Sequence, residues 1–496
     1  MSATPQPDRF RPVTPEVIRA LIAIVGREHV ITCGDELDVY GHDESEDLFV
    51  PAEVAVRPGS TAEVSKVLAL ASKERIPVTP RAAGTGLSGG AIPVHGGIVL
   101  SVTRMDRILE LDAANLVAVV QPGVITERLQ NAVEAIGLYY PPDPASRGSC
   151  TIGGNVAENA GGPHCVKYGL TRDYVVSLEA VLADGRVMRT GGKMRKDVAG
   201  YDLSHLLVGS EGTLAVVTEA TLRLVPLPRF RRLVFAPFAD LDAAARAITA
   251  LYAARISPSA LELMERSALA AAEAHLGRKV PGGDAEASLL VEVDGQDEAA
   301  VDADLVRVGE VLLEAGAIDA VLADTPAKEK DLWRIRRCIG EAVKKIASYV
   351  ECDTAVPPSR VPELIRGVRA VAARFGIRQI TYGHAGDGNL HVNVLSDDPD
   401  PVERETRLRP AIEAIFDVAA SLGGTITGEH GVGCVQSRYL SKCRDATAIA
   451  AMKAIKAALD PLGILNPGKV LEPPPFDVIP RRPRSRAPAS PGYGPP

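Results

Sequence analysis

The spacing of hydrophobic and polar positions changes character along this 496-residue chain. From residue 14 to residue 226, short apolar runs typical of strands are mixed with a few amphipathic helices. Ser60 and Glu63 form a capping-box pattern before one of these helices. Helices are predicted at 14–25, 63–75 and 126–136, and strands at 54–56, 76–79, 98–102, 116–121, 175–182, 186–190 and 214–217. The mixture indicates an α+β arrangement.

After Pro226 and Pro228 the pattern becomes one of strands alternating with alanine-rich helices. Strands at 232–235, 260–264, 288–293 and 318–322, with helices at 240–254 and 298–315, have the order typical of a ferredoxin-like antiparallel sheet. Further helices are predicted at 329–347, 361–375, 403–421 and 446–459, and strands at 378–382 and 390–395. We therefore expect an arm and helix (1–49), a glycine-rich domain (50–226), a second domain ending in helices (227–472), and a proline-rich, basic tail (473–496) that is disordered by composition.

Four glycine-rich loops lie between residues 80 and 213, most of them next to a predicted strand end. The first, PRAAGTGLSGG at 80–90, contains the sequence GxGxxG. A Rossmann dinucleotide site needs a helix that opens at such a loop, but the next predicted element is the strand at 98–102. The backbone N–H groups of the loop can still form a nest for a pyrophosphate. We expect a large phosphate-bearing ligand that spans several loops, in a fold other than the Rossmann fold.

Three of the nine histidines fall in two short glycine-rich segments, 383–393 and 427–431. Two neutral imidazoles and one carboxylate with an open position form a ligand set for a catalytic divalent metal. His384, His391 and Glu429 supply that set, which leaves Asn393 and His430 for a substrate. The alternative is a glycine-rich hairpin whose histidines satisfy local hydrogen bonds. The second segment favours the metal site, because a base beside a metal ligand is what catalysis needs.

Composition narrows the class of protein. The net charge is −8 and Trp333 is the only tryptophan, so we expect neither nucleic acid nor an anionic membrane surface as the main partner. The seven cysteines show no CxxC spacing, which argues against a ferredoxin-type iron–sulfur cluster in this chain and fits a reducing compartment. The sequence contains neither an apolar signal region nor a run of about 18 apolar residues. We therefore expect no transmembrane segment and a cytoplasmic location.

Eight motifs stand in order along the chain: PRAAGTGLSGGA (80–91), YPPDPAS (140–146), CTIGGNVAENAGG (150–162), KYG (167–169), GGKMRKDVAGYDLSHLLVGSEGTL (191–214), GHAGDGNLHVN (383–393), TGEHGVG (427–433) and NPGK (466–469). Together they resemble the FAD-linked oxidases and dehydrogenases of the vanillyl-alcohol-oxidase type. The branch that they resemble contains the flavoprotein subunit of glycolate oxidase and the D-lactate and D-2-hydroxyglutarate dehydrogenases. The resemblance covers residues 20 to 470.

The resemblance implies a two-lobed FAD-binding domain over 50–226, followed by a substrate-cap domain that holds the metal site. Some family members bond a histidine of the first loop to the flavin, but Ala82 and Ala83 occupy that part of the loop here. The FAD is therefore expected to be non-covalent. The residues that the resemblance assigns to FAD are Arg81, Ala82, Ala83, Gly84, Thr85, Gly86, Leu87, Ser88, Pro142, Asp143, Ser146, Cys150, Thr151, Gly153, Gly154, Asn155, Gly161, Val217 and Asn466.

By the same resemblance, the metal ligands of the dehydrogenase branch match His384, His391 and Glu429, with zinc the expected metal. The amide that contacts the substrate matches Asn393, and the catalytic histidine matches His430. The arginine that clamps the substrate carboxylate matches Arg336. The implied reaction oxidises a small 2-hydroxy acid to the 2-oxo acid, with hydride transferred to the flavin. A separate acceptor, either a protein such as an iron–sulfur subunit or a quinone, would take the electrons. A homodimer is one expected assembly.

Glu351 departs from the pattern, because the 2-hydroxyglutarate enzymes place a lysine for the second substrate carboxylate at this spacing. An uncompensated anion there would repel a dicarboxylate, which favours glycolate or D-lactate as the substrate. Two alternative functions stay open: a D-2-hydroxyglutarate dehydrogenase, and an FAD-dependent transferase of the alkyl-ether-lipid synthase type. No amphipathic membrane helix of the kind that a lipid synthase would use is visible. A third alternative, an inactive flavin- or metal-binding subunit, fits less well with a complete set of catalytic residues.

Overall fold

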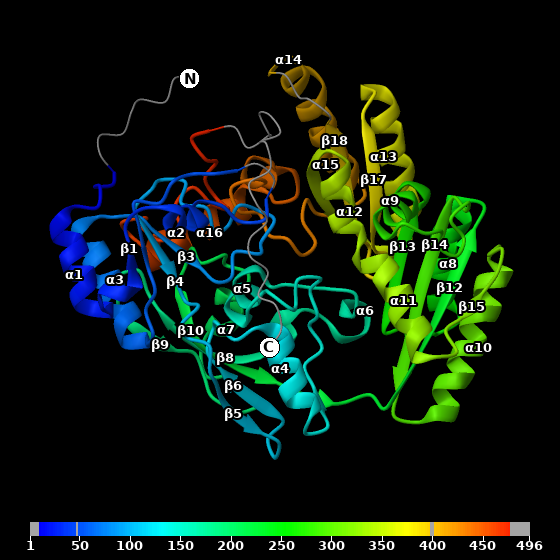
Figure 1. Cartoon of the computed structure of the whole chain (residues 1–496), viewed down its shortest axis with the longest axis horizontal. Helices are drawn as coiled ribbons and strands as arrows, with labels where there is room; N and C mark the ends of the chain where they lie inside the picture. The colour runs from blue at the N-terminus through cyan, green and yellow to red at the C-terminus, as the bar shows by residue number, and fades with distance from the viewer. Residues whose placement is uncertain (1–8, 46–47, 397–400, 477–496) are drawn as a thin grey trace.

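The computed structural model describes residues 9–45, 48–396 and 401–476, so the start of the predicted arm and most of the predicted tail lie outside the described residues. The chain up to residue 226 forms two lobes, and residues 230 to 421 form a large sheet with flanking helices, here called the cap. In Figure 1 the lobes occupy the left of the view and the cap the right. The predicted α+β class is confirmed. Within the described residues, no helix is both long and apolar enough to cross a membrane.

The first lobe is built on a mixed four-stranded sheet of order β1-β2-β4-β3. The predicted apolar face of α3 (Thr61–Glu74) is buried against this sheet. Glu63 N–H donates to Ser60 Oγ at 3.3 Å, so the predicted cap at Ser60 is confirmed, although the helix begins at Thr61 and not at Glu63. The Glu63 carboxylate accepts from the N–H of Gly59, one residue before the cap, at 2.7 Å. The elements are α1 (Pro15–Val25), η1 (Arg27–His29), β1 (Val30–Ile31), α2 (Asp35–Asp38), η2 (Val39–Gly41), β2 (Val54–Val56), α3 (Thr61–Glu74), β3 (Val78–Arg81) and β4 (Ile98–Ser101).

The second lobe is built on an antiparallel five-stranded sheet of order β5-β6-β10-β8-β9. The predicted hairpin over 175–190 is confirmed, with Val181 paired to Val187. The sequence pattern does not predict β5, whose residues are all at least partly exposed. The elements are β5 (Ile108–Asp112), β6 (Val117–Val120), α4 (Thr126–Glu134), β7 (Leu138–Tyr139), α5 (Ile152–Glu158), α6 (Cys165–Tyr168), η3 (Thr171–Tyr174), β8 (Val175–Val181), β9 (Val187–Arg189), α7 (Leu203–Leu207), β10 (Val216–Arg223) and β11 (Val225–Pro226).

The first two glycine loops give one confirmation and one correction. Residues 82–97 are irregular and β4 follows them, so the GxGxxG sequence opens no Rossmann helix, as predicted. The second loop is not irregular throughout, because α5 begins within it at Ile152. Glycine ordinarily disfavours a helix, but an added Cβ at Gly153 would lie 2.6 Å from the side chain of Pro122. Close packing against Pro122 explains this glycine better than a loop does.

The cap is a seven-stranded antiparallel sheet of order β15-β12-β14-β13-β17-β18-β16. Its first four strands have the predicted ferredoxin-like order, with α8 and α10 as the crossover helices. The sequence pattern predicts neither α9, between β13 and β14, nor the edge strand β16. The strands are β12 (Phe230–Phe238), β13 (Ala260–Glu265), β14 (Ala287–Gly295), β15 (Val321–Leu322), β16 (Ser348–Ala355), β17 (Arg378–His384) and β18 (Asn389–Ser396).

Helices bury both faces of the cap sheet. Along β12, Leu233 and Phe235 belong to the core beneath α9, α11 and α12, whereas Val234 and Ala236 belong to the core beneath α8, α10, α13 and α15. The helix predicted over 329–347 is divided at Cys338 into α11 and α12. The helices after residue 230 are α8 (Leu241–Ala253), α9 (Arg266–Leu276), α10 (Glu298–Glu314), α11 (Pro326–Arg337), α12 (Ile339–Ile346), η4 (Pro358–Arg360), α13 (Val361–Phe375), α14 (Pro401–Glu403), η5 (Arg404–Leu408), α15 (Arg409–Ser421), η6 (Ser437–Lys442) and α16 (Ala446–Leu459).

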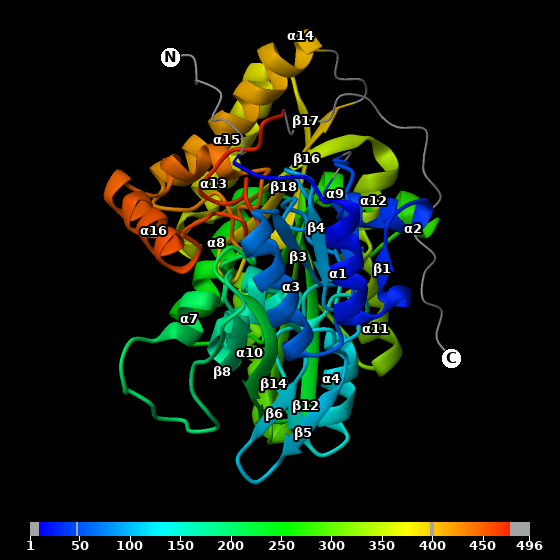
Figure 2. The same cartoon turned by 90° about the vertical axis from the view of Figure 1, so that its left-hand side faces the viewer.

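The chain returns to the lobes after the cap, as the view in Figure 2 from the side of the first lobe shows for α16. Leu465 bridges to Val78 of β3, and Asn466 N–H donates to Val78 O at 2.7 Å. Cys434 N–H donates to Ser88 O in the first glycine loop at 3.0 Å. This return brings the segment that follows Thr427–His430 against the first glycine loop.

Candidate active site

The β17–β18 hairpin places the two histidines predicted as metal ligands. His384 ends β17 and His391 lies near the start of β18, with their ring centroids 5.2 Å apart. The connection requires a glycine at Gly388, where φ is +84° and an added Cβ would lie 1.9 Å from a backbone carbonyl oxygen. Side chains alternate along a strand, so Val392 enters the core while His391 and Asn393 share the opposite face.

One buried carboxylate holds the segment that contains the third predicted ligand. Asp353, on β16, is fully buried. Its Oδ2 accepts hydrogen bonds at 2.8–2.9 Å from three consecutive backbone N–H groups, those of Gly428, Glu429 and His430. The Thr427 hydroxyl donates to the same oxygen at 2.8 Å. Four donors on one ionised oxygen fix the backbone of this loop. Sequence reasoning missed Asp353, because no strand is predicted at β16.

The loop places Glu429 among three imidazoles. Glu429 Oε1 lies 3.1 Å from His384 Nε2, 3.6 Å from His391 Nε2 and 3.7 Å from His430 Nε2. The His430 ring stacks on His391 with centroids 5.1 Å apart. His384, His391 and Glu429 therefore offer one atom each within 4.8 Å of one another. The structure brings together the three residues that the sequence assigns to a metal.

Carboxylates also occupy the outer nitrogens of two of these imidazoles. His384 Nδ1 lies 2.8 Å from Glu262 Oε1, and His391 Nδ1 lies 3.1 Å from Glu351 Oε1. A carboxylate on one ring nitrogen fixes the tautomer and turns the other nitrogen toward a metal. Sequence reasoning missed Glu262. The signal that identifies it is a glutamate inside β13, a strand that is buried along its whole length.

Glu262 also binds Arg336, the arginine assigned to the substrate carboxylate. Arg336 Nε donates to Glu262 Oε2 at 2.6 Å. The guanidinium carbon lies 4.9 Å from the centroid of the Tyr382 ring. Among the described residues, none accepts a hydrogen bond from the two terminal nitrogens of Arg336. That edge of the guanidinium is available to a carboxylate.

The charges of the cluster follow from its burial and its close contacts. Burial raises the pKa of Glu429, but the imidazoles of His384, His391 and His430 outweigh burial and lower the pKa to about 2. Burial lowers the pKa of His391, whereas the neighbouring carboxylates of Asp353, Glu351 and Glu429 outweigh burial and raise it to about 9. Glu429 is therefore an anion across the physiological pH range, as a metal ligand has to be.

The interpretation of Glu351 as an uncompensated anion is wrong. Its carboxylate lies 3.1 Å from His391 Nδ1 and 3.7 Å from His430 Nδ1, so two imidazoles face it. Pairing of β16 with β18 sets Glu351 opposite Asn393. Glu351, His391 and His430 even form a second set of potential metal ligands, which shares His391 with the first. Repulsion at Glu351 therefore gives no argument against a dicarboxylic substrate.

The first glycine loop, at residues 82–87, is partly exposed between the buried Arg81 and Ser88. Gly84 has φ +75°, and an added Cβ would lie 2.1 Å from the Arg81 guanidinium, so only glycine fits. Arg81 donates to the backbone oxygen of His42 at 2.5 Å and so supports the loop from one side. At Gly86 an added Cβ would meet its nearest neighbour only at 3.9 Å. The loop thus leaves space beside its backbone.

Three uncharged residues assigned to FAD carry buried oxygens that lack a hydrogen-bond partner in the described part of the chain: Ser88 Oγ, Thr151 Oγ1 and Asn466 Oδ1. Buried polar atoms without a partner are rare and call for a ligand or water. Asn466 Nδ2 donates to the carbonyls of Gly90 and Glu211, which leaves its oxygen free. The residues present therefore fit an FAD. Of the other residues assigned to FAD, Pro142 is buried. Those that are partly exposed include Ala83, Thr85, Leu87, Ser146, Gly153 and Val217.

Contacts between loops join the FAD residues to the metal cluster. An added Cβ at Gly154 would lie 3.5 Å from Ala82, so α5 lies against the first glycine loop. An added Cβ at Gly161 would lie 2.6 Å from Glu429 Oε2. The cofactor side and the metal side of the site are therefore immediate neighbours.

Other residues assigned to FAD use their side chains within the protein. Asn155 Nδ2 donates to Thr126 Oγ1 at 2.7 Å, and Cys150 Sγ lies 3.4 Å from the same hydroxyl. Asp143 Oδ1 lies 2.9 Å from Nδ1 of His164, a buried histidine that sequence reasoning did not single out. These side chains stabilise the walls of the site.

The chain matches two protein families along most of its length. Residues 52–191 match the FAD binding domain, and residues 227–470 match the C-terminal domain of FAD linked oxidases. The chain is 42% identical over 459 residues to the glycolate oxidase subunit GlcD of Bacillus subtilis strain 168, which covers 92% of this chain and 97% of that relative. It is 37% identical over 471 residues to D-lactate dehydrogenase of Anaerostipes hadrus, which covers 93% of this chain and 98% of that relative. The chain therefore belongs to the FAD-linked oxidases and is an FAD-dependent oxidoreductase.

Solved structures with the same fold are more distant in sequence. p-Cresol methylhydroxylase superposes with a TM-score of 0.73 at 17% identity, covering 93% of this chain and 97% of its own. Alkyldihydroxyacetonephosphate synthase superposes with a TM-score of 0.72 at 19% identity, covering 92% of this chain and 86% of its own. At these identities the likeness shows the fold alone, and it confirms the predicted vanillyl-alcohol-oxidase type.

Proposed function

We propose that this protein oxidises a small 2-hydroxy acid to the 2-oxo acid, using FAD and a divalent metal, zinc foremost, at His384, His391 and Glu429. The position of Glu262 carries the proposal. One of its carboxylate oxygens binds Arg336 at 2.6 Å and the other binds His384 at 2.8 Å. A 2-hydroxy acid has its carboxylate and hydroxyl on neighbouring carbons. The anchor for the carboxylate and the ligand set for the hydroxyl therefore have to adjoin, as they do through Glu262.

Each residue of the site then has its own role. Arg336 holds the substrate carboxylate with its two terminal nitrogens, and Asn393 adds a hydrogen bond. His384, His391 and Glu429 would hold a divalent metal, which would supply Lewis acidity that lowers the pKa of the substrate hydroxyl. His430 accepts the hydroxyl proton, held in place by its backbone hydrogen bond to Asp353 and its stacking on His391. FAD, held by the glycine-rich loops of the lobes, would supply the acceptor for the hydride of C2.

The flavin is proposed to be non-covalent, because Ala82 and Ala83 occupy the part of the first loop where a tethering histidine would stand. Precipitating the purified yellow protein with acid should release all its FAD into the supernatant. Absorbance of the supernatant and of the redissolved pellet measures the two fractions. Flavin that stays with the precipitated chain would show that the tether exists.

The electron acceptor is proposed to be separate from this chain, and to be a protein such as an iron–sulfur subunit or a quinone. All seven cysteines are free thiols and they lie apart along the chain, without CxxC spacing. Electrons on the flavin therefore need a second molecule. Stopped-flow reoxidation of the substrate-reduced protein by a soluble quinone, compared with oxygen, measures this preference.

We propose glycolate or D-lactate as the substrate, because the two relatives described above carry these activities in their names. Anaerobic addition of each acid should bleach the visible flavin band, and D-2-hydroxyglutarate tests the alternative substrate. Arg336→Gln should keep the flavin spectrum, keep reduction by dithionite and lose bleaching by hydroxy acids. If dithionite bleaches the wild-type flavin and no 2-hydroxy acid does, the proposal is wrong and a transferase without net oxidation gains support.

A further inference from the structure

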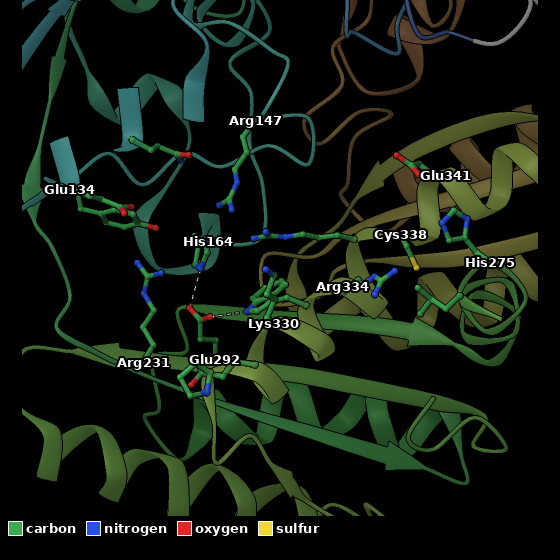
Figure 3. A pocket seen from close by; sticks show the side chains of 17 residues that line it. Glu134, Arg147, His164, Arg231, His275, Glu292, Lys330, Arg334, Cys338 and Glu341 are labelled. Atoms are coloured by element: carbon green, nitrogen blue, oxygen red, sulfur yellow. Dashed lines mark hydrogen bonds and ion pairs between the residues drawn. The ribbon is translucent and has the colours of Figure 1, made fainter. Parts of the chain in front are cut away.

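A cavity of about 630 Å³ lies where the second lobe meets the cap (Figure 3). The lobe contributes Tyr139, Arg147 and His164, while the cap contributes Arg231 from β12 and Trp333 from α11. In Figure 3, Arg147 and Arg231 approach the same space from opposite sides. The volume lies within the range of small-molecule sites. None of the residues assigned to FAD, metal or substrate lines this cavity.

Arg231 lacks the partners that its neighbour has. Arg232, on the opposite face of β12, binds Asp302 at 2.7 Å and Glu298 at 2.9 Å. Among the described residues, none forms an ion pair or hydrogen bond with the Arg231 side chain, whose guanidinium carbon lies 5.3 Å from the Tyr139 ring centroid.

Burial lowers the pKa of Arg231, but Tyr139, Glu292 and Asp294 nearby outweigh burial and raise it, although none of these acidic groups binds the guanidinium directly. Within the part of the chain that the structure describes, the hydrogen-bond donors of this half-buried guanidinium are without an acceptor. Arg231 is therefore arranged for an anion that enters the cavity.

Two more guanidinium groups border the cavity and are only loosely paired. Arg147 lies 3.8 Å from Asp143 Oδ2 and 3.5 Å from Glu127, and Arg337 lies 3.7 Å from Asp143 Oδ2. The Asp143 carboxylate itself is held more closely by His164, at 2.9 Å. This carboxylate therefore leaves both arginines with capacity for a further oxyanion.

Cationic side chains are in the majority on the wall. Lys330 and Arg334 add two more, against the acidic Glu134, Glu329 and Glu341. Glu292, also on the wall, is paired with His164 at 3.0 Å. Burial lowers the pKa of His164, but Asp143 and Glu292 outweigh burial and raise it to about 10, so this imidazole is a cation as well.

Helix α11 separates the cavity from the active site. Arg336 turns to Glu262 in the active site. Its neighbour Arg337 turns to the cavity, with its guanidinium carbon 5.1 Å from the centroid of the Trp333 ring. An occupant of the cavity would contact the residue next to the substrate anchor without taking the place of the substrate.

We propose that this cavity binds a small organic anion with two or more negative charges, a polycarboxylate or a phosphorylated compound. Arg231 of the cap, Arg147 of the lobe and Arg337 of α11 supply planar, multidentate donors for its oxygens. Because the donors come from both sides of the interface, the ligand ties the cap to the second lobe. The proposal does not depend on which hydroxy acid the active site oxidises.

Trp333 provides a local signal for binding, because it is the only tryptophan and it lines the cavity. The FAD-loaded protein is titrated with tricarballylate or with inorganic phosphate at constant ionic strength, and tryptophan emission is followed. Tricarballylate has no 2-hydroxyl, so it is not a substrate. The expected result is a saturable change with at least one probe. The tricarboxylate and phosphate arms distinguish the two sources of negative charge.

Arg231→Gln should weaken that binding about tenfold or more, as loss of one charged hydrogen-bonding group predicts. Arg232→Gln, on the other face of the same strand, is the matched control and should leave the affinity within about twofold. Both variants should keep their FAD and their turnover of the hydroxy acid. A change that never saturates, or that saturates equally in Arg231→Gln, would overturn the proposal. If Arg336→Gln lost the fluorescence change and Arg231→Gln kept it, the anion would bind in the active site, and the proposal would be overturned as well.

Discussion

The protein buries histidines among carboxylates in two regions. The two regions differ in which ring nitrogens remain available to a ligand. His164 has a carboxylate on each nitrogen, Asp143 at 2.9 Å and Glu292 at 3.0 Å. In the candidate metal cluster the outer nitrogens of two histidines are paired in the same way, but the inner nitrogens of three converge on Glu429. The first arrangement has no ring nitrogen available to a metal. In the second arrangement, several potential ligand atoms are directed to one point.

Composition does not distinguish these two regions, since both consist of histidines and acidic residues in a buried setting. The two regions are distinguished by what the second ring nitrogen of each histidine faces. His164 has a carboxylate of the second lobe beside one ring nitrogen and a carboxylate of the cap beside the other, so it links the two parts. A histidine with a carboxylate beside one ring nitrogen has its other nitrogen directed toward a ligand. The predictions below test this difference, from the largest expected effect to the smallest.

His391→Ala should remove the metal and lower turnover by about 10³-fold or more, within the range of losing one essential catalytic group. FAD content should stay at the wild-type level, because the assigned flavin loops lie in the lobes. His164→Gln is the control and should keep its metal. Elemental analysis and steady-state rates measure both variants. If wild-type protein purified without a chelator contained no stoichiometric metal, the ligand assignment would be contradicted.

The His164 bridge should make stability depend on pH. Its pKa is raised from 6.5 to about 10 in the folded protein, so its contribution is complete below pH 6.5 and is lost as pH rises toward 10. The upper bound for that contribution is about 4–5 kcal/mol. Denaturant unfolding of the FAD-loaded protein should show a wild-type advantage over His164→Gln at pH 6.5 that shrinks by pH 9.5. An advantage that stays constant over this range would show that the imidazolium is not what stabilises the interface.

Asp353→Asn should lower the free energy of unfolding by about 3 kcal/mol, because an amide replaces the ionised oxygen that four donors share. Thr427→Val removes one of those donors and should cost about 1 kcal/mol. Urea unfolding measures the loss in the free energy of unfolding for each variant. Equal costs for the two changes would mean that the backbone N–H groups find other partners when the carboxylate is lost.

Glu351→Gln should weaken metal binding about 10–100-fold, the usual effect of removing an outer partner of a ligand histidine. Glu351→Lys should weaken it further, because a cation would then face His391 and His430. Competition with a chelator measures both affinities. If Glu351→Lys kept its metal and gained efficiency on D-2-hydroxyglutarate relative to D-lactate, Glu351 would face the substrate, as the sequence predicts.

Much of the fold is predictable because its signals are local. The buried face of α3, the start of that helix at Ser60 and the ferredoxin-like strand order follow from apolar spacing and turn residues within each segment. The errors have physical causes. Helix α5 carries glycines for close packing against Pro122, and β16 is an edge strand whose sequence mixes polar and apolar residues. Its buried positions are set by β18, its neighbour in the sheet.

The sequence by itself identified the glycine loop without a Rossmann helix and the candidate ligands His384, His391 and Glu429. Motifs show these because their members are close in the chain. Only the tertiary structure decided which carboxylates orient them. Glu262 meets His384 across 122 residues and Asp353 meets Glu429 across 76. An ion pair depends on distance in space, which the folding of the cap sheet sets and the spacing along the chain does not.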